Sequence, residues 1–182
     1  MTVLPTVGAL VPRPALDAPD LLAPSVAALL HSWPHADRVA VAEIDPAVAD
    51  TAALVAAYDV PADVSANCVV VTGRRAGEER TAACVVLATT RADVNGAVRR
   101  LLDVRKASFL SVDRAVEETG MEYGGITPVG LPAGWRVLVD ARVTHVPLAV
   151  IGSGVRRSKL LLPGALLSEL PGAEVVDALA LG

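Results

Sequence analysis

The chain has 182 residues, of which 53% are hydrophobic and only 3% aromatic, and its formal net charge is −4. A chain of this length can form one domain with a substantial core, but it is too short for two. The core must be built from Val, Leu, Ile and Ala, because aromatic residues are scarce. The mild negative charge gives no overall attraction to nucleic acid, so any RNA contact must come from local basic clusters.

The sequence lacks the features of a membrane or secreted protein. No run reaches the roughly 18–20 apolar residues that a membrane span requires. The N-terminus has no basic segment followed by an apolar stretch and a cleavage site. Cys68 and Cys84 lie in apolar, strand-like runs, which favours buried free thiols over a disulfide. These features predict a cytoplasmic protein with no membrane partner.

The first 35 residues differ from the rest because prolines interrupt any long element. One short helix is predicted at 25–32, with Val26, Leu29 and Leu30 on its apolar face. We interpret residues 1–35 as a Pro/Ala-rich N-terminal extension that lies on the domain surface or joins an oligomer contact. The prolines that define it are Pro5, Pro12, Pro14, Pro19 and Pro24.

From residue 38 onward, β-branched runs alternate irregularly with helical patterns. A helix is expected to open with a capping box at Thr90–Asp93 and to continue to Leu102. Six or seven strands without a strict βαβ order predict an α/β (α+β-like) single domain over residues 36–182, with a mixed, mostly antiparallel sheet flanked by helices. The predicted strands are 39–44, 67–72, 81–90, 107–110, 135–139, 146–151 and 159–162, and the predicted helices are 47–58, 90–102, 111–120 and 163–170.

A glycine-rich stretch at 119–130 stands out as a candidate binding loop. Gly124 and Gly125 can adopt positive φ and allow a ligand to approach the backbone closely. Pro128 has a fixed φ and biases Thr127 toward an extended conformation. The expected result is a stiff loop whose amides and carbonyls could hold a small polar group. An ordinary tight connection between two elements is the alternative.

Side chains for common catalytic chemistries are missing. His31, His35 and His145 are scattered, and no Cys/His spacing suits a metal, so no metal or cofactor is predicted. Neither a nucleophile elbow nor a phosphate or dinucleotide fingerprint is present. Asp140 could serve as a general base, although an Asp at the end of a strand more often caps a turn. The catalytic residues therefore stay unassigned at this stage.

Several of these segments together resemble the YbaK family, which includes the editing domain associated with prolyl-tRNA synthetase. The matching segments are Thr119-Gly120, the run from Gly124 to Gly130, Asp140 after a strand, and 152–156 before the apolar run 160–162. The resemblance extends from about residue 38 to the C-terminus. It implies a partly closed, barrel-like sheet, and hydrolysis of the ester that joins a wrong amino acid to tRNA.

The resemblance also implies where the substrate binds. The amino acid would sit between the 124–128 loop and the 152–154 loop, and the attacking group would be water or, for cysteine, the substrate's own thiol. Backbone groups would polarise the ester carbonyl, as positioning and electrostatics require no catalytic triad. The substrate-binding residues that follow from the match are Asn67, Gly124, Gly125, Ile126, Thr127, Pro128, Gly152, Ser153, Gly154 and Arg156.

Three positions depart from the family pattern. Asn67 stands where members usually carry a lysine that holds the tRNA end, Ser153 is shifted by one place, and Lys159 occupies an acidic position. Lys159 also belongs to one of the basic clusters that could contact phosphates. The expected partner is the acceptor end of an aminoacyl-tRNA, not DNA, and a homo-oligomer is possible.

Three functions stay open on the sequence. The first is a trans-acting aminoacyl-tRNA deacylase with a Cys-tRNA(Pro)- or Ala-tRNA(Pro)-like substrate. The second is a catalytically weak or inactive module of the same fold that binds tRNA or a partner protein. The third is a small-molecule ester or amide hydrolase.

Overall fold

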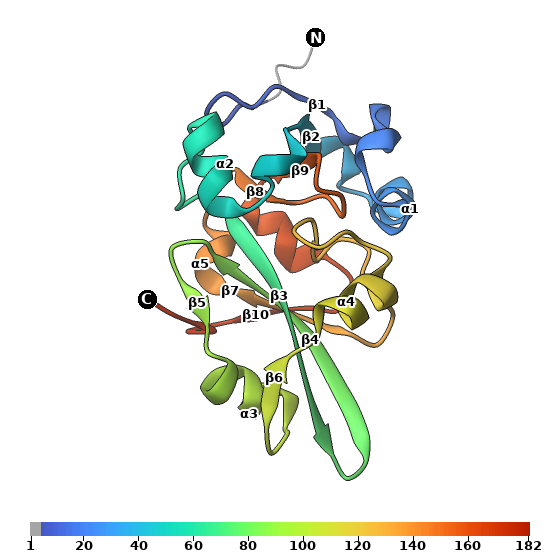
Figure 1. The fold of residues 1–182 in the computed structure, drawn as a ribbon, viewed down its shortest axis with the longest axis vertical. Coiled ribbons are helices and arrows are strands. Elements are labelled where there is room, and N and C mark those ends of the chain that lie inside the picture. Colours follow the sequence, from blue (N-terminus) through green and yellow to red (C-terminus); the bar gives the residue numbers. More distant parts are fainter. Residues whose placement is uncertain (1–4) are drawn as a thin grey trace.

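A computed structural model describes residues 5–182 of the chain, which form three β-sheets and five α-helices (Figure 1). The first sheet is antiparallel throughout. Its strands, in spatial order, are β1 (Pro12–Pro14), β2 (Ala40–Glu43), β9 (Ser158–Leu162) and β8 (Ala149–Gly152).

The second sheet is mixed, because β7 (Arg136–Asp140) runs parallel to both of its neighbours while the other pairs are antiparallel. A two-stranded ribbon of β11 (Ala180–Leu181) and β5 (Arg91–Ala92) forms the third sheet. The long hairpin of β3 (Ala66–Arg75) and β4 (Glu78–Leu87) extends from the middle of the molecule to its lower end (Figure 1). The strands of the second sheet, in spatial order, are β10 (Ala173–Val176), β7 (Arg136–Asp140), β4 (Glu78–Leu87), β3 (Ala66–Arg75) and β6 (Ala107–Phe109).

The predicted single α/β domain is confirmed, but the barrel-like closure is wrong. None of the three sheets in the described residues closes on itself. β8 approaches the beginning of β3 through one isolated parallel bridge, between Val150 and Ser65. One bridge cannot extend the ladder, so the two larger sheets meet at an open junction.

The helices begin and end at residues with clear local signals. Asp50 caps α2 by accepting a hydrogen bond from the Ala53 amide at 3.0 Å. Gly120 ends α4 in the left-handed conformation, with φ of +66°. The α-helices are α1 (Pro24–Ser32), α2 (Thr51–Tyr58), α3 (Arg99–Leu102), α4 (Val112–Thr119) and α5 (Ala141–Thr144). Short 3₁₀ turns cover Ala15–Asp17, Pro19–Leu21, Ala36–Arg38, Pro46–Val48 and Gly164–Glu169.

Three helix predictions need correction. The segment predicted at 47–58 divides into a 3₁₀ turn and α2, and the segment predicted at 163–170 is a 3₁₀ helix. The capping box at Thr90 does not form, because the Thr90 hydroxyl donates to the Leu87 carbonyl instead. Asp93 is the cap, and it accepts from the amides of Gly96 and Ala97 at the start of a π-helical stretch, Val94–Val98.

The N-terminal segment is built into the main core. Val26 and Leu30 of α1 are fully buried in the largest hydrophobic cluster, together with residues of β2, β7, β8 and β9. Trp33 packs beside them, and its indole N–H donates to the Glu169 carbonyl at 3.3 Å. The predicted helix at 25–32 is confirmed as α1. Residues 1–4 of the predicted extension lie outside the described residues.

Both cysteines are free, as predicted. Cys68 lies opposite Val85 across the β3–β4 hairpin, whereas Cys84 lies opposite Val69. Directly opposed residues share one face of a sheet, so the two thiols point to opposite faces and cannot be joined. Between residues 5 and 182, no helix is both long and apolar enough to cross a membrane.

Candidate functional site

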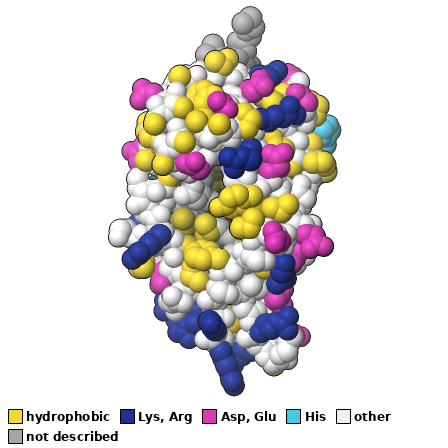
Figure 2. Space-filling view, viewed as in Figure 1, with side chains coloured by type: hydrophobic (Ala, Val, Ile, Leu, Met, Phe, Trp, Pro, Cys, Tyr) yellow, Lys and Arg dark blue, Asp and Glu magenta, His cyan; other side chains and the backbone are white. Residues whose placement is uncertain are grey.

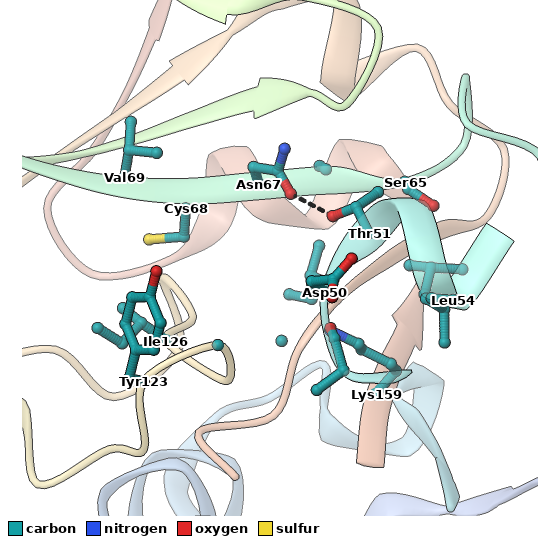
Figure 3. Close-up of a pocket in the computed structure, with 16 residues that line it drawn as sticks. Asp50, Thr51, Leu54, Ser65, Asn67, Cys68, Val69, Tyr123, Ile126 and Lys159 are labelled. Atoms are coloured by element: carbon teal, nitrogen blue, oxygen red, sulfur yellow. Dashed lines mark hydrogen bonds between the residues drawn. The ribbon is translucent and has the colours of Figure 1, made fainter. Parts of the chain in front are cut away.

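A cleft of about 250 Å³ lies where α2, the beginning of β3, the glycine-rich loop and the paired ends of β8 and β9 come together. Asn67 and Thr51 face it from one side, and Tyr123 and Ile126 from another (Figure 3). The lining residues are Ala49, Asp50, Thr51, Leu54, Ser65, Ala66, Asn67, Cys68, Val69, Tyr123, Gly124, Ile126, Val150, Ile151, Gly152 and Lys159.

The two predicted glycine loops are in direct contact. The Gly154 amide donates to the Gly125 carbonyl at 2.7 Å, and the Glu122 amide donates to the Gly154 carbonyl at 2.9 Å. A Cβ atom at Gly152 would lie 2.5 Å from the Gly125 carbonyl oxygen, so only glycine permits this approach. The expectation that an amino acid lies between the loops is therefore corrected: hydrogen bonds occupy that space, and the cleft lies beside the loops.

The predicted binding residues fall into two groups. Asn67, Gly124, Ile126 and Gly152 line the cleft. The others, Gly125, Thr127, Pro128, Ser153, Gly154 and Arg156, are not among its lining residues. The first group can contact a ligand in the cleft directly, whereas the second acts through the shape of the loops.

The side chains of the second group have structural partners or are enclosed. The buried Ser153 hydroxyl lies 2.7 Å from the Ser158 hydroxyl and holds the second loop in shape. Thr127 is completely buried, and its hydroxyl has no hydrogen-bond partner within residues 5–182. Pro128 lines a separate depression together with Leu29 and Trp135.

Arg156 links two segments at the edge of the cleft through hydrogen bonds. Its guanidinium donates to the Tyr123 carbonyl at 3.1 Å and to the Pro46 carbonyl at 2.9 Å. Its own amide donates to the Glu122 carboxylate at 2.6 Å. These contacts join the glycine-rich loop to the turn before α2. Arg156 thus sets the shape of the opening, and two of its donors are engaged by protein carbonyls.

Asn67 presents a polar group on the opposite wall. Its side-chain oxygen accepts a hydrogen bond from the Thr51 hydroxyl at 2.7 Å (Figure 3). This bond orients the amide, so the amide nitrogen with its two donors is left for a ligand. Asn67 also borders a second depression. It therefore stands at the junction of two hollows.

Lys159, which the sequence analysis placed in a basic cluster, is instead a buried residue of the cleft wall. Its side chain is only 7% exposed, and its ammonium donates to the Ala49 carbonyl at 2.7 Å. Burial first, and then the nearby Arg156 charge, lower the pKa of Lys159 to about 8, while Asp50 opposes this shift. The available signal was a lysine opening a strand whose other residues are buried, a rare place for a charge without a function.

Two other candidates are excluded as the nucleophile or base. Cys68 lines the cleft, but burial raises the pKa of its thiol well above the ordinary value, so it stays neutral. Asp140 lies outside the cleft and caps α5. Burial alone would raise the pKa of Asp140, yet hydrogen bonds from Arg142 and from the Ala180 amide lower it overall. Its role is structural, which agrees with the turn-capping alternative.

No residues suited to a metal are gathered here. Within the described part of the chain, no group of three or more His, Cys, Asp or Glu side chains lies close enough to bind a metal ion. The polar groups of the cleft are main-chain groups, the Asn67 amide, the Asp50 carboxylate, the buried Lys159 ammonium, and the hydroxyls of Thr51, Ser65 and Tyr123.

Comparisons with known proteins fit this arrangement. The chain superimposes on the crystal structure of a proposed trans-editing enzyme for prolyl-tRNA synthetase with a TM-score of 0.73 and 22% identity, covering 88% of this chain and 99% of that one. A scaffold protein from work on epitope backbone grafting gives a TM-score of 0.71 and 23% identity, covering 88% and 97%. The hypothetical protein APE2540 gives 0.62 and 25%, covering 71% and 83%. No curated protein matches the sequence.

The family of the chain follows from its sequence. Residues 45–170 match the family described as the aminoacyl-tRNA editing domain, a span that includes α2, both glycine loops, β3 and Lys159. The match covers more than half of the chain and every residue that lines the cleft. The chain therefore belongs to the aminoacyl-tRNA editing domain family.

Proposed function

We propose that this protein is an aminoacyl-tRNA deacylase that acts in trans on mischarged tRNA and hydrolyses the ester between the amino acid and the terminal ribose. Membership of the editing-domain family supports the reaction class. A fold shared with a proposed trans-editing enzyme for prolyl-tRNA synthetase is consistent with action in trans. The observation that carries the proposal is the cleft, in which polar main-chain groups and one buried cation surround a small space.

Two kinds of donor could stabilise the negative charge that develops on the ester carbonyl oxygen. The amides of Gly124 and Ile126, both on the cleft wall, donate to no other atom of residues 5–182. The Lys159 ammonium has three donors, of which the Ala49 carbonyl takes one. Donors fixed in advance in a partly dry site stabilise a tetrahedral oxyanion strongly, because they need not reorganise.

The reaction itself needs no protein nucleophile. A water molecule forms the new bond to the carbonyl carbon, and the bond from that carbon to the ribose oxygen breaks. One water proton ends on the ribose oxygen, the other is released to solvent, and the amino acid leaves as its carboxylate. The protein's contribution in this scheme is positioning and charge stabilisation, which can supply a large rate factor.

The size and polarity of the cleft indicate the substrate class. Apolar side chains of Leu54, Ile126, Val150 and Ile151 enclose a small volume, which suits an amino acid with a short side chain such as alanine or cysteine. Asp50 supplies the one carboxylate among the lining residues, and we assign it to the α-ammonium of the aminoacyl group. A Cys-tRNA(Pro)- or Ala-tRNA(Pro)-like substrate fits these requirements.

A deacylation panel tests the proposal. Purified protein is mixed with tRNAs charged with alanine, cysteine, proline and a bulky residue such as phenylalanine, and the loss of charged tRNA is followed. Faster loss of the alanyl or cysteinyl ester than of the phenylalanyl ester supports the assignment. Rates equal to buffer for every ester would contradict it, and bound but uncleaved tRNA would favour the inactive binding module.

A further inference from the structure

A second depression, of about 510 Å³, adjoins the cleft and shares Asn67 and Val69 with it. Asn67 and Val69, which point to one face of β3, line both hollows, whereas Cys68, which lies between them and points to the other face, lines the cleft alone. Its volume falls in the range of about 300–1,000 Å³ that small-molecule sites occupy. Its charged lining residues are Arg91 and Asp93, and the Asp93 carboxylate accepts hydrogen bonds from the amides of Gly96 and Ala97. Asn67, Asn95, Phe109 and Leu181 also line it.

The wall of this depression carries an unusual exposed aromatic ring. Phe109 is the only phenylalanine of the chain, and it is 63% exposed. It lies on β6, the edge strand of the five-stranded sheet, directly opposite the fully buried Val71. Opposed residues share a face, so the hydrophobic cluster below Val71 supports the strand while the ring stays open to solvent.

The segment that supplies most of the lining, residues 66–110, is basic although the protein is acidic, and Arg91 is its one Lys or Arg residue in the lining. Residues 66–110 contain eight of the sixteen Lys and Arg residues but only four of the twenty Asp and Glu residues, which gives this span +4 against −4 for the whole chain. Lys and Arg side chains gather at the lower end of the molecule (Figure 2). No ion pair within residues 5–182 engages Arg91, Arg99, Arg100, Arg105 or Lys106.

We infer that this depression binds the single-stranded 3′ end of RNA, with a nucleobase stacked on Phe109 and a backbone phosphate at Arg91. Stacking on exposed aromatic rings combined with a basic surface is how proteins hold single strands without reading their sequence. The inference rests on the proposed function, because a chain end lying here would pass Asn67 and place its acyl group in the cleft. In this arrangement the main-chain groups of the loops bind the ester, and the Phe109 ring stacks on a base of the RNA.

Binding of a fluorescent single-stranded RNA ending in CCA tests the inference. Replacing Phe109 by Ala or Leu should weaken binding by about 5- to 150-fold, the range measured when a stacking ring is removed. Phe109→Trp should retain binding because it retains a ring. Arg91→Gln should weaken binding and reduce the magnitude of the salt slope by about 0.7, as expected for one lost phosphate contact on a single strand.

Controls separate stacking from unfolding. Val175→Ala changes a 49% exposed side chain on β10, at the opposite edge of the same sheet, and should leave binding unchanged. Thermal unfolding should be the same for all Phe109 variants. Wild-type affinity in Phe109→Leu, or equal losses in Phe109→Leu and Phe109→Trp, would overturn the inference. Competition by free AMP as strong as that by the RNA would overturn the assignment to a chain end.

The outcome is separable from that of the proposed function. If wild-type protein deacylates tRNA while Phe109→Ala turns over and binds like wild type, the inference alone fails. If wild-type protein cleaves no ester but the Phe109 variants lose RNA affinity as described, the inference holds and the deacylase assignment fails.

Discussion

Replacing Lys159 with methionine should make the protein more stable and less active. The ammonium is 7% exposed, and one backbone carbonyl is its hydrogen-bond partner within the described residues. Methionine has a similar length, carries no charge and adapts to irregular spaces. The change therefore removes the cost of a buried charge while leaving the cleft nearly the same size.

The magnitude follows from the pKa of Lys159, which burial lowers from 10.5 to about 8. Each tenfold change in proton affinity corresponds to about 1.4 kcal/mol, so holding the charge below pH 8 costs about 3 kcal/mol. The unfolded chain binds this proton more tightly than the folded one. Wild-type stability is therefore lowest, relative to the methionine variant, below pH 8, and the deficit disappears as pH rises to about 10.5.

Thermal unfolding of both proteins at pH 6.5 and pH 10.5 measures this difference. We expect the variant to gain about 1–3 kcal/mol at the lower pH, since loss of the hydrogen bond to Ala49 offsets part of the gain. A domain of this size gains about 2–4 °C in Tm for each kcal/mol. Deacylation should fall about 100- to 1,000-fold, as when one oxyanion donor is removed. Lys106→Met, at an exposed lysine, is the matched stability control and should change little.

Two results would refute this reasoning. A stability difference that is the same at both pH values would show that the Lys159 ammonium is not held at a cost. Undiminished deacylation by a well-folded variant would remove Lys159 from the mechanism. Stability gained together with activity lost would instead identify a charge that is kept for function.

Three further predictions concern the loops, the cap and the N-terminal segment. Gly152→Ala places a Cβ 2.5 Å from the Gly125 carbonyl oxygen and should separate the two loops, so deacylation should fall by more than the modest loss of Tm explains. Gly134→Ala, whose Cβ would lie in open space, is the control and should affect Tm alone. Asp140→Asn should lower the free energy of unfolding, measured with denaturant, by about 1–3 kcal/mol without changing turnover per folded molecule. In the wild type, the stability that the ionised Asp140 carboxylate contributes is present above about pH 4 and is lost as pH falls through its lowered pKa. Leu30→Ala should cost about 2–5 kcal/mol, because a side chain that is 1% exposed leaves a cavity in the main core, and an unchanged Tm would show that α1 is dispensable.

Much of the secondary structure was predictable because local signals were strong. The β-branched run around Val70 and its partner around Cys84 form the central hairpin, as expected. Gly120 ends α4 at the predicted place. Errors arose where two local signals competed. Thr90 had the spacing of a capping box, but Asp93 is the N-cap residue, because each of its two carboxylate oxygens accepts a hydrogen bond from a backbone amide.

The candidate site was predictable only in part. The glycine loops could be identified because positive φ and close backbone approach require glycine. That the loops touch each other, with the cleft beside them, depends on the hydrogen bond from Gly154 to Gly125, 29 residues apart in the chain. Lys159 was assigned to a surface cluster with Arg156, because the sequence does not show which side of β9 is enclosed by α2.

The sequence alone determined the elements and the rigid loops, because helix caps, strand propensity and glycine geometry act over a few neighbouring residues. It also determined the family to which the chain belongs. The tertiary structure decided that the sheets stay open, that α1 completes the core, and that a lysine and an asparagine from distant strands face one cleft. Those outcomes depend on which side chains are buried and on which distant segments shield each other from water, and both are set only when the chain has packed.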